Sequence, residues 1–529
     1  MSADLIIRNI HFPEVDFPEG SDTLAITAGR ISAIGRHAEF VALAGPQTQL
    51  IDAGHHTLLP GFNDTHIHIW KVGHLKTFML DLRGTESLDD MLSRLEIHAK
   101  ANPQAKWIIA RGFNEISWTS GKSTSGKGPD KTDLDRIIPD RPVYVIRTCA
   151  HIAVANTKAL ELAGIRADSP VPDGGTMYLG TDGKPNGVFA ETALGMITRH
   201  IPETSKEELK TMVRAATAEL HRYGITAATD PAVDPLLLKT YHEMNTAGEL
   251  GFRLHAMPML LPDGGARPYP IPDPFSSDMF NVNTVKFFSD GGLSGKTSAL
   301  KRTYRDSNEK GILRLERNLY GSLSRAAMEK GLGIATHAIG DAAIEYVIDV
   351  YKELHKDYPS LIKRIEHLGL PEKKHLVDMA AHGIAASMQT IFISELGRNF
   401  IRYLDDQYLA GCYPVRSVMD HGILTALSSD APVVRDINPL KGIKAAVTRR
   451  TNEGDVIAPA EGISIAQALK AYTQDAASIS GSMDTGRLEV GRYADLVLLD
   501  RDPTTTDPNE LTDIHVKKTI VNGKVVWES

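Results

Sequence analysis

The chain has 529 residues, 42% hydrophobic and 23% charged, which is typical of a globular protein and excludes disorder over most of its length, collagen and coiled coil. With 58 basic and 66 acidic residues, the net charge of −8 gives no reason to expect a nucleic-acid partner. Two cysteines exclude a disulfide scaffold, and neither a membrane span of roughly 20 apolar residues nor a signal peptide is apparent, so we expect a cytoplasmic protein with no membrane partner.

The two ends of the chain predict short β-hairpins. Four segments alternate apolar and polar residues, as half-buried strands do: 4–9, 22–35, 486–500 and 514–527. Asn522-Gly523 in the last of them is a strong signal for a tight hairpin turn. We therefore expect 1–57 and 484–529 to form one composite β-sandwich domain.

The middle of the chain alternates short apolar segments with helical stretches, which predicts a parallel sheet built from βαβ units. Eight of these segments end in a polar residue suited to chemistry: 57–68, 225–230, 252–258, 284–290, 333–338, 363–368, 383–389 and 423–430. Eight strands close a TIM-type (β/α)8 barrel, so we expect an α/β fold with a barrel over 58–483. Residues 72–200, with further strand candidates at 107–111 and 143–147, are expected to form an insertion subdomain after the first barrel strand.

Histidines and one aspartate gather at the ends of the predicted strands, where barrel enzymes place their chemistry. His66 and His68 lie two residues apart, on one face of an extended chain, and can converge on one cation. His337 and His367 end two later strands, and Asp430 ends the last. Any one histidine could be a structural core residue, but four with a carboxylate at matching positions are hard to explain by packing. Such ligands suit zinc or a similar divalent metal in a hydrolytic site.

Lys286 occupies an unusual position within Val285-Lys286-Phe287-Phe288, a predicted barrel strand. A charged lysine in the packed interior is costly unless it is paired or neutralised. Two interpretations are open. Lys286 either forms a salt bridge or extends to solvent, or it reacts with CO2 to give a carbamate, a carboxylated lysine that could bridge two metals.

Several motifs resemble the amidohydrolase superfamily. The segment 60–68 (PGFNDTHIH) resembles its first-strand motif. Further segments resemble its YtcJ-like branch, which includes N-substituted formamide deformylases: 147–156 (RTCAHIAVAN), 285–291 (VKFFSDG), 337–341 (HAIGD), 364–367 (RIEH), 429–432 (SDAP) and 486–497 (GRLEVGRYADLV). The match is colinear over nearly the whole chain. The resemblance implies a metal-bearing barrel flanked by a β-sandwich, with a metal site formed by His66, His68, Lys286, His337, His367 and Asp430.

The predicted function is metal-dependent hydrolysis of a C–N bond other than a peptide bond, of the amide or N-substituted formamide type. One or two divalent ions, with zinc expected, would activate a hydroxide. Asp430 is predicted to accept the proton of the water and pass it to the leaving nitrogen. The expected partner is a small-molecule substrate, and a homodimer is the expected assembly because dimers are common among symmetric oligomers.

Substrate contacts are expected from the loops and the insertion. The candidates are the segment 390–416 and the residues Arg111, Trp118, His151, Asn156, Glu191 and Asp341. Three of them have a structural alternative, since His151 could belong to the core, Glu191 could start a helix and Asp341 could cap the helix predicted at 341–355.

Other functions are open at this point. A deaminase, or an ester or lactone hydrolase, would use the same metal site and differ in the product released. A metal-free binding protein of the same fold would have lost ligands, and none is missing here. The segment 290–297 is similar to a phosphate-binding loop, but Asp290 stands where that motif requires glycine, which argues against an NTPase.

Overall fold

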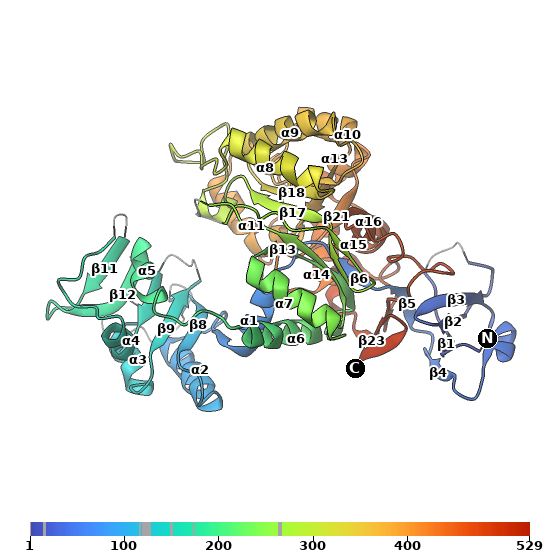
Figure 1. Cartoon of the computed structure of the whole chain (residues 1–529), viewed down its shortest axis with the longest axis horizontal. Helices are drawn as coiled ribbons and strands as arrows, with labels where there is room; N and C mark the ends of the chain where they lie inside the picture. Colours follow the sequence, from blue (N-terminus) through green and yellow to red (C-terminus); the bar gives the residue numbers. More distant parts are fainter. Residues whose placement is uncertain are drawn as a thin grey trace. The chain divides into compact units, whose positions relative to one another are not determined.

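The computed structural model describes residues 2–13, 17–115, 118, 128–148, 152–172, 175–262 and 267–529 (Figure 1). The chain forms two compact units: unit 1 comprises Met1–Ile69 and Thr217–Ser529, and unit 2 comprises Trp70–Ala216. Among the described residues, no helix is both long and apolar enough to cross a lipid bilayer.

Two four-stranded sheets built from both ends of the chain share one apolar core in unit 1. Their orders are β3-β2-β1-β4 and β24-β23-β22-β5. The strands are β1 (Leu5–Arg8), β2 (Thr23–Thr27), β3 (Arg30–Gly35), β4 (Gln49–Asp52), β5 (Thr57–Pro60), β22 (Leu496–Leu499), β23 (Val516–Val521) and β24 (Lys524–Glu528). The predicted turn between β23 and β24 is confirmed, because Asn522 and Gly523 have φ angles of 50° and 74°, as a type I′ turn requires.

Each of the eight segments predicted as barrel strands contains one strand that belongs to one of two five-stranded sheets of unit 1. The sheet orders are β15-β16-β14-β13-β6 and β17-β18-β19-β20-β21. Neighbouring strands are parallel apart from the pair β15 and β16. The strands are β6 (Phe62–Asp64), β13 (Ile225–Val233), β14 (Arg253–Pro258), β15 (Phe275–Ser276), β16 (Phe280–Val282), β17 (Thr284–Phe288), β18 (Gly333–Ala338), β19 (Lys363–His367), β20 (Ile384–Met388) and β21 (Thr425–Leu427).

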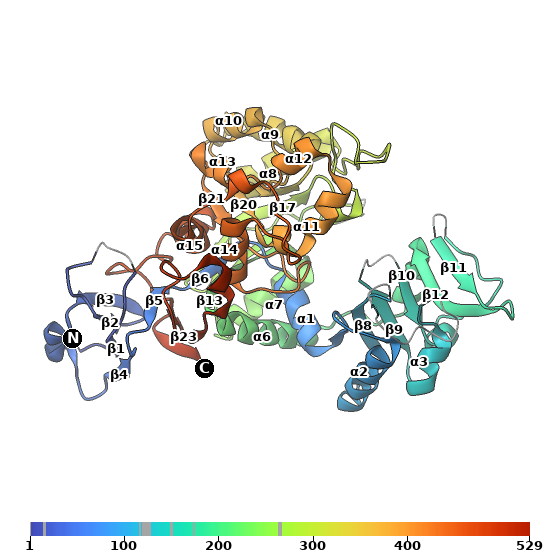
Figure 2. The same cartoon turned by 180° about the vertical axis from the view of Figure 1, so that it is seen from behind.

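Helices follow these strands, which gives unit 1 a mixed α/β fold. Figure 1 and Figure 2 show α9 and α10 side by side. The helices of unit 1 are α7 (Pro235–Thr246), α8 (Arg317–Glu329), α9 (Asp341–His355), α10 (Lys373–Ala381), α11 (Ile391–Tyr403), α12 (Asp406–Ala410), α13 (Val415–Asp420), α14 (Pro439–Thr448), α15 (Ile465–Tyr472) and α16 (Gln474–Ile479). Helices α1 (Ile69–Thr77) and α6 (Lys206–Arg222) connect unit 1 to unit 2 along the chain.

Local contacts join the two five-stranded sheets at two places. Met259, just after β14, forms a parallel bridge with Lys286 of β17. Beyond the edge strands β6 and β21, the N–H of Asp430 donates to the carbonyl of His66 at 2.7 Å, and the N–H of His68 donates to the carbonyl of Ala431 at 2.9 Å. The segments that follow β6 and β21 are therefore neighbours, and both carry predicted metal-site residues.

The first predicted barrel segment, 57–68, consists of two strands that belong to different sheets. Strand β5 pairs antiparallel with β22, whereas β6 pairs parallel with β13. Gly61 separates them at a close approach, because a Cβ there would come within 2.2 Å of Oγ1 of Thr226. The terminal sheet thus reaches Pro60, beyond the boundary predicted at residue 57.

Unit 2 contains a six-stranded sheet with the order β11-β12-β10-β9-β8-β7. Alternate residues of β9 enter two different apolar cores, with Val143 and Val145 in one and Tyr144 in the other, so both faces of this sheet are covered. The elements are β7 (Met79–Asp81), α2 (Leu88–Ala101), β8 (Ile108–Phe113), α3 (Lys131–Ile137), β9 (Val143–Arg147), β10 (Ile152–Ala155), α4 (Thr157–Leu162), β11 (Gly175–Leu179), β12 (Pro185–Glu191) and α5 (Gly195–Thr198).

Candidate metal centre

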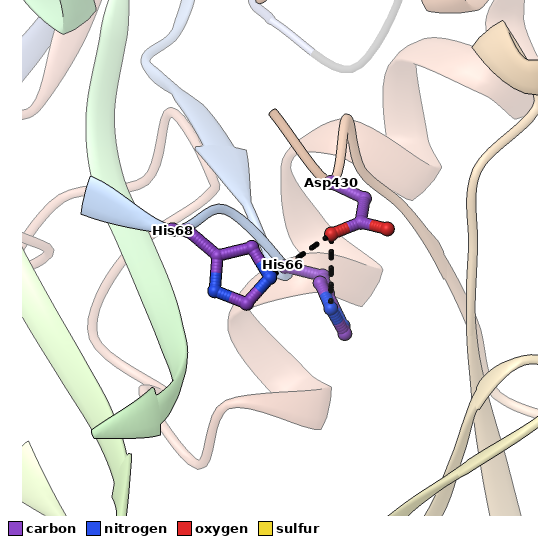
Figure 3. A group of neighbouring side chains, drawn as sticks. All are labelled: His66, His68 and Asp430. Atoms are coloured by element: carbon purple, nitrogen blue, oxygen red, sulfur yellow. Dashed lines mark ion pairs between the residues drawn. The ribbon is translucent and has the colours of Figure 1, made fainter. Parts of the chain in front are cut away.

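His66, His68 and Asp430 come together as one buried group (Figure 3). Oδ1 of Asp430 lies 3.4 Å from Nε2 of His66 and 3.3 Å from Nε2 of His68. One nitrogen or oxygen from each residue can be chosen so that all three atoms lie within 4.8 Å of one another. Two imidazoles and a carboxylate at this spacing can bind one divalent cation.

The backbone around this group departs from regular strands. Strand β6 ends at Asp64, so His66 and His68 lie in the bend that leads to α1, and not on an extended strand end as expected. Asp430 has a φ of 58°. A residue other than glycine in the left-handed region carries backbone strain of about 1–3 kcal/mol, and such strain is concentrated at functional sites.

The two other predicted histidines extend the same cluster. The ring centroid of His367 lies 4.8 Å from that of His66 and 4.4 Å from that of His337. His367 is the last residue of β19 and has a φ of 74°, which interrupts the alternation of the strand at this point. The structure thus brings all four histidines and Asp430 into one part of unit 1.

Three histidines of the cluster have a polar partner on one ring nitrogen. Nδ1 of His66 lies 2.5 Å from Oε2 of Glu366, and Nδ1 of His367 lies 2.6 Å from Oε1 of Gln389. Nε2 of His337 lies 3.1 Å from the carbonyl oxygen of Gly291. The nitrogens that remain for a metal are therefore Nε2 of His66, Nε2 of His367 and Nδ1 of His337.

The partners Glu366, Gln389 and Asp290 were missed as functional residues by the sequence prediction. Oδ1 of Asp290 lies 3.2 Å from Nε2 of His337, and its carboxylate also accepts backbone N–H bonds from Ala299, Ile339 and Gly340. The available signal was position, because Asp290 and Gln389 are the last residues of predicted strands and Glu366 lies two residues before the end of another.

Lys286 is fully buried, so the interpretation that it extends to solvent is wrong. Within the part of the chain that the structure describes, its Nζ has no hydrogen-bond partner, and it lies 4.8 Å from the ring centroid of Phe288. Burial lowers the pKa of Lys286 to about 8, and the nearby carboxylates of Glu366 and Asp430 limit this decrease. The amine is thus less strongly protonated at neutral pH than an exposed lysine.

Asp430 and His367 have the protonation states that metal binding requires, whereas the charge of Asp430 raises the pKa of His66 despite its burial. Burial, together with the neighbouring imidazoles of His337 and His66, lowers the pKa of His367 well below its usual range. Burial alone would raise the pKa of Asp430, but His66 and His68 outweigh it and hold this pKa well below the usual range. Asp430 is therefore an anion and His367 is neutral at neutral pH.

Asp341, a predicted substrate contact, is buried at the start of α9, and the predicted helix 341–355 is confirmed. Its carboxylate accepts hydrogen bonds from Tyr408 Oη at 2.8 Å and from the backbone N–H groups of Lys301 and Ala342. The helix cap is Gly340, so Asp341 is not the cap residue. Together with Tyr408 of the segment 390–416, Asp341 lines a cavity of about 320 Å³.

Two predicted substrate contacts, Trp118 and Asn156, are buried and make their contacts within unit 2. Trp118 is 7% exposed and packs in the core that includes Val143 and Val145. Asn156 is fully buried and caps α4. Its Oδ1 accepts from two backbone N–H groups and its Nδ2 donates to two backbone carbonyls, so its amide is fully used within unit 2.

The role of these two residues in substrate binding stays a prediction, as it does for the other candidates of unit 2. Arg111 is half-buried on β8, and burial followed by the charge of Arg83 lowers the pKa of its guanidinium. Glu191 is exposed at the end of β12, before the 3-10 helix Thr192–Leu194, with a φ of 54°. His151 lies outside the residues that the structure describes.

The chain is similar to known proteins over nearly its whole length. The sequence profile described as "Amidohydrolase family" matches residues 49–527. The amidohydrolase-family protein YtcJ of Bacillus subtilis (strain 168) is 30% identical over 527 residues, which cover 96% of this chain and 97% of YtcJ. N-substituted formamide deformylase of Arthrobacter pascens is 26% identical over 547 residues, covering 99% of this chain and 98% of the deformylase.

A likeness in three dimensions extends over nearly the whole chain. An uncharacterized metal-dependent hydrolase from Pyrococcus horikoshii OT3 superposes with a TM-score of 0.77 at 24% sequence identity, covering 96% of this chain and 99% of that one. At this identity the likeness shows a shared fold.

Proposed function

Because this chain belongs to the amidohydrolase family and is a hydrolytic enzyme, we propose that it is metal-dependent and cleaves the C–N bond of an amide or an N-substituted formamide. The observation that carries the proposal is the convergence of His66, His68 and Asp430 within 4.8 Å. The similarity to the deformylase of Arthrobacter pascens supports the type of bond.

The residues of the cluster fit a divalent ion. His66, His68, His337, His367 and Asp430 would hold one or two ions, and zinc is the ion best suited to a site rich in imidazole with a carboxylate. When bound, such an ion supplies a hydroxide near neutral pH and polarises the substrate carbonyl.

Asp430 would act as the general base and then as the general acid. It is ionised at neutral pH, because His66 and His68 hold its pKa well below the usual range. A carboxylate in this state can accept a proton from water. It can then deliver this proton to the leaving nitrogen, which departs as a neutral amine.

Lys286 would carry the carbamate that a two-metal site needs. In that step the neutral amine forms an N–C bond to CO2 and loses one proton, which leaves a carboxylate on a long stem. Complete burial of Lys286, the lack of a hydrogen-bond partner for Nζ among the described residues, and a pKa of about 8 support this role.

The two five-stranded sheets would be the halves of one (β/α)8 barrel. The Met259–Lys286 bridge at one junction and the hydrogen bond between Asp430 and His66 at the other support closure. The two terminal sheets, which share one core, would then form the composite β-sandwich, with unit 2 as the insertion after the first barrel strand.

The test combines metal analysis with identification of the product. Protein purified without chelator should contain about one or two zinc-like ions per chain. From an amide or N-substituted formamide substrate, it should release an amine together with formate or another acid. Release of ammonia would favour a deaminase, and release of an alcohol would favour an ester or lactone hydrolase. A chain that takes up no metal even after supplementation would contradict the proposal and favour a binding protein of the same fold.

A further inference from the structure

Arg364 and Glu366 of β19 form a buried ion pair that touches His66. Nε of Arg364 lies 2.5 Å from Oε1 of Glu366, and Nη2 lies 3.0 Å from Oε2. The two residues are 2% and 0% exposed. Oε2 of Glu366 is also the atom that lies 2.5 Å from Nδ1 of His66. A single carboxylate therefore connects the guanidinium to the imidazole.

Arg364 also holds the backbone next to His66. Its Nη2 donates a hydrogen bond to the carbonyl oxygen of Thr65 at 2.8 Å. Arg364 and Glu366 are two positions apart on a strand and so lie on the same face of it. Arg364 thus fixes the main chain that leads to His66, while Glu366 fixes the ring.

Burial of such a pair is unfavourable unless its geometry is excellent, because both the carboxylate and the guanidinium must be desolvated. Apolar residues of similar size often give the folded protein equal stability. Apolar residues in place of the pair could not form the hydrogen bond to Nδ1 of His66. As an acceptor, the Glu366 carboxylate would keep a proton on Nδ1 and leave the lone pair on Nε2, the atom 3.4 Å from Oδ1 of Asp430.

We propose that Glu366, held by Arg364, is a positioning residue that orients His66 and fixes the tautomer in which Nε2 is free to bind the metal. This inference rests on the proposed function, since it assigns His66 as a ligand. Carboxylate partners of metal-binding histidines typically affect metal affinity or activity by about 10–100-fold.

A second buried ion pair of unit 1 provides a matched control. Nε of Arg253 lies 2.5 Å from Oδ2 of Asp495, and Nη2 lies 3.0 Å from Oδ1. Both residues are about as buried as Arg364 and Glu366. The Arg253–Asp495 pair contacts other residues, including Tyr493, and the contacts described for it include none of the proposed ligands.

The experiment compares zinc affinity in the full-length wild type, Glu366→Gln and Asp495→Asn, measured by competition with a chromogenic chelator. We expect Glu366→Gln to weaken zinc binding by about 10–100-fold and Asp495→Asn to change it by less than about threefold, although both lose a buried ion pair. Glu366→Asp, which keeps the charge, should recover part of the affinity.

Equal zinc affinity in Glu366→Gln and Asp495→Asn would overturn the positioning role and leave the proposed function standing. A wild type with no zinc affinity would overturn both. If Glu366→Gln does not fold, nitrogen NMR of histidine-labelled wild type decides. The His66 resonances of the wild type are assigned as those missing from the spectrum of His66→Asn. They must show the proton on Nδ1 and a zinc-dependent shift of Nε2, and a proton on Nε2 would overturn the inference.

Discussion

The backbone N–H of Ser429 donates to Oδ1 of Asp64 at 3.1 Å, across 365 positions of the sequence. The same oxygen accepts the N–H of His66, also at 3.1 Å. One buried oxygen therefore joins the bend that carries His66 and His68 to the segment that carries Asp430. The arrangement of the proposed metal ligands depends on a residue that is not itself in the ligand group.

Replacing Asp64 should show whether its hydrogen bonds or its charge stabilise the fold. We expect Asp64→Ala to lower the free energy of unfolding by about 2–4 kcal/mol, because two buried N–H groups lose their acceptor. Asp64→Asn keeps an acceptor oxygen and should cost much less. Urea denaturation of both variants provides the measurement, and equal losses would show that the charge of Asp64, and not its hydrogen bonds, stabilises the fold.

Asp430→Asn should reduce kcat by about 10²–10⁴-fold, because an amide cannot accept the proton of the attacking water. Turnover and bound metal should be measured on the same preparation. His515→Ala, at an exposed histidine next to Asp500, is the matched control and should retain both metal and turnover. Near-normal turnover of metal-loaded Asp430→Asn would refute the general-base role.

The buried Lys286 should make the free energy of unfolding depend on pH in metal-free protein kept free of bicarbonate. Its pKa of about 8 in the folded state lies below the ordinary value of 10.5, so the unfolded chain binds this proton more tightly. The free energy of unfolding should therefore rise with pH between about 8 and 10.5, because folding then no longer has to bury a charged Lys286 or remove its proton. Lys286→Met should lack that rise and should be more stable than the wild type at pH 7, by about 2–4 kcal/mol. Parallel curves of unfolding free energy against pH would contradict the assignment.

Asn156 should matter for stability and not for substrate binding. Asn156→Ala leaves buried backbone groups of unit 2 without their partners and removes the cap of α4, so we expect a loss of about 2–4 kcal/mol in the free energy of unfolding. The KM of the folded enzyme should stay at the wild-type value. Asn509→Ala, at an exposed residue, serves as the control for stability, and a raised KM in Asn156→Ala would support a role of Asn156 in substrate binding.

The sequence by itself determined the eight strand segments in the middle of the chain, the terminal hairpins and the set of chemical groups at the strand ends. These features depend on local signals: apolar alternation with a period of two, a turn such as Asn522-Gly523, and a polar residue where an apolar segment stops. The positions of His66, His68, His337, His367 and Asp430 follow from such signals and from a family resemblance. The structure brings these five residues into one cluster.

The tertiary structure alone decided which groups surround the histidines and which backbone groups the amide of Asn156 binds. Glu366 meets His66 across 300 positions, because strand β19 and the segment after β6 are brought together by packing and not by a local pattern. In the same way, nothing near Asn156 in the sequence shows that its amide faces the backbone of neighbouring segments. A hydrogen-bond partner depends on which elements become neighbours and on side-chain direction, and neither is encoded in a short stretch of sequence.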